Sequence, residues 1–151
     1  MPNQLIVKNE ISINAAASKV WDALTNPEQT KKYMFGCEAL SDWKVGSPLL
    51  WKGAHEGKEM IFVKGYVLIF QPNSLLKFTV IDPNASYPDT PENHLNVIYE
   101  LSEQDGQTIL TVLQDGFENA AEGEKRYQHT YNNGEGWNPI LVQIKAVAET
   151  K

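Results

Sequence analysis

The chain has 151 residues, of which 42% are hydrophobic and 10% aromatic, which is typical of a single globular domain, here residues 1–151, rather than of a disordered segment. Its 13 Lys and Arg against 19 Asp and Glu give a net charge of −6, which disfavours nucleic acid or an anionic membrane surface as a partner. One cysteine, no signal-peptide pattern and no apolar run long enough to span a bilayer lead us to expect a cytoplasmic protein.

Two patterns follow each other at the start of the chain. Residues 5–13 alternate apolar and polar side chains, which predicts a strand with one buried face. Residues 17–24 then place their apolar side chains at helical spacing, so we expect a short helix that starts near Ala16 with Asn14 as its cap.

A second short helix and a series of strands come next. Asn26 is predicted to cap this helix, with Pro27 in its first turn and its end near Tyr33. The following apolar segments are separated by short turns, which favours antiparallel neighbours and a meander. We expect strands near residues 37–41, 47–53, 58–70, 74–82, 94–103 and 107–115.

Two segments interrupt or follow these strands. Residues 82–93 carry three prolines and no periodicity, so they predict a long loop that a compact domain either uses or leaves mobile. Apolar side chains at helical spacing begin at Trp137 and predict the long C-terminal helix. Because Pro139 has no N–H, it must lie in the first turn, and the helix should start between Glu135 and Asn138.

Five stretches, in this order, carry a resemblance to a known family. They are ISINAAASKVWDALTNPEQ (11–29), DWKVG (42–46), GYVLIFQPNSLLKFTV (65–80), VIYELSEQDGQTILTVLQDGF (97–117) and EGWNPILVQIK (135–145). Together they resemble the START-like (SRPBCC) superfamily, and within it the bacterial relatives of the C-terminal domain of the activator of Hsp90 ATPase. The resemblance implies an α+β helix-grip fold, also called Bet v 1-like, in which a curved antiparallel sheet wraps round the long C-terminal helix.

The helix-grip topology also suggests a function. A sheet wrapped round a helix leaves a cavity where inward side chains do not meet, and such cavities suit mainly apolar ligands. We therefore predict noncatalytic binding of a small hydrophobic molecule, aromatic or lipid-like, by side chains that would otherwise fill the core. The candidate ligand-binding residues are Phe35, Trp51, Phe62, Phe78, Tyr99, Val112, Gln114, His129, Trp137 and Leu141.

Two of these candidates leave alternatives open. The segment around Phe62 is apolar on both faces, so its pattern does not settle whether Phe62 or Val63 points inward. Gln114 shares the inward face of its strand, and a buried amide needs hydrogen-bond partners. Its partner is either the ligand or backbone at the end of the strand.

Motifs for other chemistry are missing from the sequence. His55, His94 and His129 form no metal-binding motif and are interpreted as surface residues, although His129 is also a candidate for the cavity mouth. Cys37 has no histidine nearby in sequence and is not expected to be a nucleophile. With nucleotide-binding glycine motifs also absent, we expect no metal and no cofactor.

Two alternatives from other functional classes stay open. START-like relatives include polyketide cyclases and aromatases, which would use the same cavity for acid–base catalysis. The resemblance also implies a possible accessory role with Hsp90, as a chaperone partner. The oligomeric state cannot be inferred from the sequence.

Overall fold

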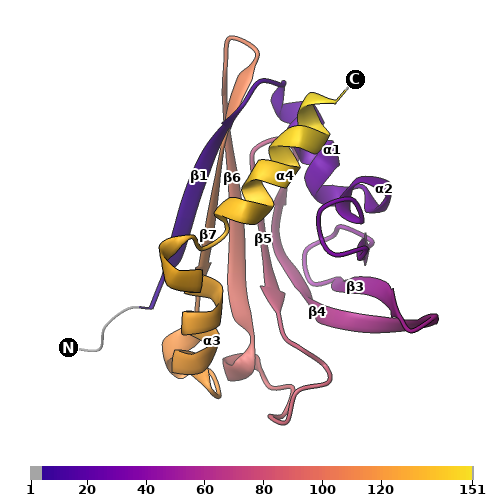
Figure 1. Ribbon diagram of the computed structural model, residues 1–151, viewed down its shortest axis with the longest axis vertical. Coiled ribbons are helices and arrows are strands. Elements are labelled where there is room, and N and C mark those ends of the chain that lie inside the picture. Colours follow the sequence, from indigo (N-terminus) through magenta and orange to yellow (C-terminus); the bar gives the residue numbers. More distant parts are fainter. Residues whose placement is uncertain (1–4, 151) are drawn as a thin grey trace.

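The computed structural model describes residues 5–150. Within them, seven antiparallel strands form one curved sheet in the order β1-β7-β6-β5-β4-β3-β2, and the helices α1 and α4 lie side by side on its concave side (Figure 1). The strands are β1 (Val7–Ile13), β2 (Glu38–Ser41), β3 (Pro48–His55), β4 (Lys58–Gln71), β5 (Leu75–Val80), β6 (Leu95–Gln104) and β7 (Gln107–Asp115). The helices are α1 (Ala17–Thr25), α2 (Pro27–Thr30), α3 (Gly123–Tyr131) and α4 (Asn138–Glu149), with 3-10 turns η1 (Pro91–Asn93), η2 (Phe117–Asn119) and η3 (Asn132–Gly134).

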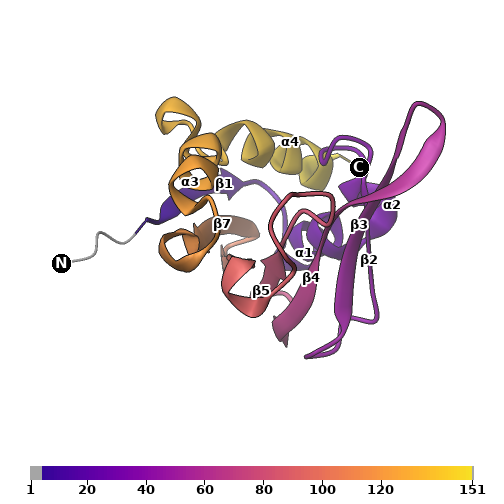
Figure 2. The same cartoon turned by 90° about the horizontal axis from the view of Figure 1, so that it is seen from below.

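This architecture confirms the predicted order of elements. Strands β2 to β7 pair with their neighbours in sequence as a meander, and β1 adds to the far side of β7. The view in Figure 2 shows the sheet turning from β1 and β7 through β5 and β4 to β3 and β2. The helices of the described region are all too short or too polar to span a membrane.

The ends of the first two helices differ in part from the prediction. Asn26 caps α2 as expected, because its side chain accepts a hydrogen bond from the backbone N–H of Glu28 at 3.0 Å. Asn14 does not cap α1, and that prediction is wrong. The Glu103 carboxylate, from the β6–β7 hairpin, accepts from the Ala17 N–H at 2.6 Å, so a residue distant in sequence satisfies the helix start.

A second difference lies at the end of α2, which stops at Thr30, and the chain reaches Tyr33 through a series of turns.

The start of α4 is fixed by contacts to β1. The helix begins at Asn138, inside the predicted range. Asn9 of β1 accepts from the backbone N–H of Trp137 at 2.9 Å and donates to the Glu135 carbonyl at 3.2 Å. Gly136 has φ +53, and a Cβ there would lie 2.3 Å from Asn9 Oδ1, so only glycine fits between the strand and the helix. These contacts fix where Trp137 enters the fold.

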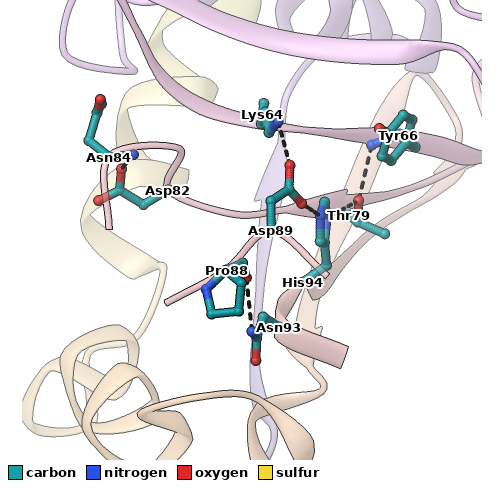
Figure 3. A network of polar contacts seen from close by, with 9 residues as sticks. All are labelled: Lys64, Tyr66, Thr79, Asp82, Asn84, Pro88, Asp89, Asn93 and His94. Atoms are coloured by element: carbon teal, nitrogen blue, oxygen red, sulfur yellow. Dashed lines mark hydrogen bonds and ion pairs between the residues drawn. The ribbon is translucent and has the colours of Figure 1, made fainter. Parts of the chain in front are cut away.

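The loop between β5 and β6 is held on the sheet by a polar network (Figure 3). Asp89 pairs with Lys64 of β4, and its Oδ1 lies 2.6 Å from His94 Nε2. On the other side of the ring, His94 Nδ1 lies 2.8 Å from the Thr79 hydroxyl of β5. His94 is only 9% exposed, so the interpretation of this histidine as a surface residue is wrong. Its ring can be buried because Asp89 and Thr79, one on each ring nitrogen, replace water.

Candidate functional site

Along the strands, the concave face of the sheet changes from pocket wall to packed core between one row of inward side chains and the next. Gln114, Val97 and Phe78 are register partners across β7, β6 and β5, and all three line a pocket of about 430 Å³, here called the inner pocket. The next inward row, two residues along each strand, is Val112, Tyr99 and Leu76, at most 1% exposed. The pocket therefore ends at a fully packed layer.

Apolar side chains line nearly all of the inner pocket. They come from the segment after α2, from β3 to β6, and from the start of α4. Among the described residues of this lining, Gln114 of β7 supplies the only amide side chain. The lining residues are Met34, Phe35, Cys37, Trp51, Phe62, Val63, Phe78, Val80, Val97, Gln114, Trp137 and Ile140.

A β-bulge places two consecutive residues of β4 on the pocket wall. Trp51 of β3 pairs with Val63, whereas Lys52 pairs with Ile61, so Phe62 is an extra residue in β4. A bulge interrupts the alternation of side chains, and both Phe62 and Val63 line the pocket. Both residues of the open alternative, Phe62 and Val63, therefore border the inner pocket.

Gln114 and Trp137 bond to each other at the edge of the inner pocket. The indole Nε1–H of Trp137 donates to Gln114 Oε1 at 2.9 Å. The Trp137 ring also meets Tyr99 edge to face, with centroids 6.0 Å apart. The prediction that the Gln114 side chain bonds backbone is therefore wrong, because its partner is the side chain of Trp137.

A second hollow of about 610 Å³, here called the outer pocket, shares Phe62, Val63 and Val80 with the inner one. The β5–β6 loop and α3 form its more polar walls. The Arg126 guanidinium lies 4.6 Å from the centre of the Tyr87 ring and donates to the Asn93 carbonyl at 2.9 Å. The remaining polar and charged residues of this lining are Asp82, Ser86, Glu122, Lys125, His129 and Thr130.

The ten predicted ligand-binding residues fall into three groups. Six border the inner pocket: Phe35, Trp51, Phe62, Phe78, Gln114 and Trp137. His129 is exposed and borders the outer pocket. Tyr99, Val112 and Leu141 border neither pocket and are fully buried in the core. Contact with a ligand remains a prediction for all of them.

Several lining residues are missing from the predicted set. Val63 was not predicted, because the alternation of side chains in the sequence does not reveal the bulge that brings it to the pocket. Ile140 lies one turn after Trp137 on the apolar side of α4, and that spacing was a usable signal. Met34 lies in turns after α2, where no periodicity indicates which side chain faces the pocket.

The ionisable groups nearest the inner pocket favour neutral forms. Burial raises the pKa of the Cys37 thiol, so little reactive thiolate forms there. Burial also raises the pKa of Tyr99 well above its ordinary value, and its hydroxyl has no hydrogen-bond partner among the residues that the structure describes. Within residues 5–150, no cluster of three His, Cys, Asp or Glu side chains could hold a metal ion.

Known structures with the same fold were found over the whole length of the chain. A Cytophaga hutchinsonii protein solved in solution is 38% identical over 99% of this chain and 97% of its own, with a TM-score of 0.75. A Chromobacterium violaceum protein is 20% identical over 100% of both chains, with a TM-score of 0.71. The Aha1 dimer from Colwellia psychrerythraea is 20% identical over 95% of this chain and 96% of its own, with a TM-score of 0.68.

The comparison with curated proteins found no match. The model of the family described as activator of Hsp90 ATPase homolog 1-like protein matches residues 14–149. Together with the relatives above, this match confirms the predicted helix-grip fold and the predicted resemblance. The chain belongs to the activator of Hsp90 ATPase homolog 1-like family.

Proposed function

We propose that this protein binds a small, mainly apolar molecule in the inner pocket and does not transform it. The observation that supports this most is a hollow of about 430 Å³ lined almost entirely by apolar side chains, which is within the range of known small-molecule sites, about 300–1,000 Å³. A cytoplasmic location is part of the same proposal.

The lining favours an aromatic ligand over a flexible lipid chain. Aromatic rings on several elements face the pocket, among them Trp51, Phe78 and Trp137. Trp51 and Phe78 lie 6.2 Å apart between centroids, a spacing at which rings contact in tilted or edge-to-face geometry. A flat ring system entering the pocket would make the same kind of contact with its walls.

The composition of the lining gives little support to the cyclase or aromatase alternative. Acid–base catalysis needs a donor and an acceptor of protons within hydrogen-bond reach of the substrate. Among the described residues that line the inner pocket, Cys37 is the only one with an ionisable side chain, and burial raises its pKa. Binding without chemistry therefore fits the lining better.

A pair of tryptophan substitutions in one strand tests the proposal. Val97 faces the pocket, and its neighbour Ile98 points to the opposite face of the sheet. With 2-ethylnaphthalene as the probe in calorimetric titration, the wild type and Ile98→Trp should bind, and Val97→Trp should not, because the indole fills the hollow.

Circular dichroism checks that each variant is folded. Ile140→Trp fills the pocket from the helix side if Val97→Trp fails to fold. Equal binding by all folded variants, or no binding by the wild type, would contradict the proposal. A thermal-shift screen of a metabolite library would then identify the natural ligand, because a ligand that binds only the native state raises its stability.

A further inference from the structure

Gln114 is a buried amide whose orientation is fixed by its partner. The residue is 6% exposed, and its Oε1 accepts from the Trp137 indole at 2.9 Å. An indole nitrogen only donates hydrogen bonds, so the amide oxygen must face Trp137. The two N–H groups of the amide therefore point away from the indole.

Those N–H groups are the donors that the pocket offers. No protein acceptor for Gln114 Nε2 is found among residues 5–150, and the side chain borders the inner pocket. The Tyr99 hydroxyl also has no partner in the described part of the chain, but it is buried in the packed row behind the pocket. An occupant of the pocket can reach Gln114 and cannot reach Tyr99.

The donor is held in place before any ligand arrives. Trp137 orients the amide, and Trp137 is itself fixed by its backbone bond to Asn9 and by the close approach of Gly136 to that side chain. A donor held by such a chain of contacts loses little freedom when a ligand binds. Gln114 is thus a preorganised recognition group.

The charge of the matching acceptor follows from the rest of the lining. The lining holds no lysine, arginine or histidine side chain among the residues described. A carboxylate or phosphate would lose its hydration there without a cation to replace it. The pocket suits a neutral acceptor, such as the oxygen of a ketone or an amide.

We propose that the ligand of the inner pocket is an aromatic compound with a neutral carbonyl-type acceptor, which receives a hydrogen bond from Gln114 Nε2. This inference rests on the proposed function and adds the polar group that the ligand must carry. A hydrocarbon of the same shape displaces any water from Nε2 without replacing its bond, which loses affinity.

The test compares two probes of similar shape, 2-acetylnaphthalene and 2-ethylnaphthalene. We expect the wild type to bind the ketone about three- to tenfold more tightly than the hydrocarbon, the range expected for one hydrogen bond. Gln114→Met removes the donor and should bring this ratio close to one. Gln143→Met, the same change on the exposed side of α4, should leave the ratio unchanged.

A second measurement needs no variant. The carbonyl stretch of carbonyl-labelled 2-acetylnaphthalene should shift to lower frequency in the wild-type complex than in a hydrocarbon solvent, as a hydrogen-bonded ketone does. Equal affinities and an unshifted stretch would overturn this inference and leave the proposed function standing. Binding of neither probe would overturn the proposed function and this inference together.

Discussion

The two ends of the concave face differ although the same strands and the same helix build them. At one end, Val112, Tyr99 and Leu141 of α4 belong to one core cluster with almost no exposed surface. At the other end, two residues along the same strands, Gln114 and Val97 face a pocket. Apolar character is shared by both ends, so it does not decide which residues are core and which are pocket wall.

The position of α4 and the curvature of the sheet account for this difference. The helix packs mainly beside β1 and α1, and Leu141 and Ile144 fill the space there. The bulge at Phe62 falls in the outer half of the sheet, and bulges increase local bending and twist. The sheet turns away from the helix on that side, and side chains no longer span the gap.

The largest expected effect on stability comes from a comparison of two neighbouring residues of α4. Leu141→Ala should lower the free energy of unfolding by about 2–5 kcal/mol, because it opens a cavity in packed core. Ile140→Ala should cost roughly 1 kcal/mol, because Ile140 is half-buried and already faces a hollow. Urea unfolding measures both, and equal losses would mean that the two ends are packed alike.

A smaller effect should come from the network that holds the loop wall of the outer pocket. Hydrogen bonds from Lys64, and then from His94, hold the pKa of Asp89 below its ordinary range. Its contribution to stability is then complete above the unfolded pKa, about 3.9, and is lost as the pH falls through the lower folded value. Exposed ion pairs are worth about 1 kcal/mol or less, so the total is modest.

Asp89→Asn isolates that contribution. The difference in unfolding free energy between the wild type and Asp89→Asn should shrink as the pH falls below about 4, where the carboxylate becomes protonated. Denaturation at a series of pH values measures it. A difference that stays constant down to pH 2 would show that the carboxylate charge contributes nothing to this wall.

The smallest expected change in stability is at Phe35. This residue is 88% exposed with φ +55, a left-handed conformation that disfavours side chains, yet it borders the inner pocket. Phe35→Gly should stabilise the protein by about 0.5–1 kcal/mol and weaken binding of 2-ethylnaphthalene. Glu56→Gly, with φ +52 in the β3–β4 turn, should match the gain in stability but leave binding unchanged.

Unchanged affinity in Phe35→Gly would remove Phe35 from the pocket wall. A loss of stability would contradict the assignment of backbone strain.

Sequence patterns predicted the inward faces of the strands but not the depth of each residue. Alternation places Tyr99, Val112 and Gln114 on one inward layer, and all three are buried. The alternation of side chains does not indicate where along the sheet α4 stops packing against this layer. Tyr99 and Val112 were therefore predicted to contact the ligand, although they lie in the packed core.

Contacts between different elements were the second feature that the sequence could not predict. The partners of His94 come from a proline-rich loop and a neighbouring strand, namely Asp89 and Thr79, and no local spacing signals them. The Gln114–Trp137 bond joins residues 23 positions apart and depends on where Asn9 anchors the helix. Local patterns describe elements, whereas these bonds arise from how the elements dock.

Methyl NMR during titration with 2-ethylnaphthalene tests the central claim most directly, because methyl groups report from both ends of the sheet. The account predicts that signals of Val80, Val97 and Ile140 shift as the probe fills the inner pocket. Signals of Leu76, Val112 and Leu141 in the packed row and core should move little. Shifts confined to the second group, or no shifts at saturating probe, would contradict the claim that the hollow end is a binding site.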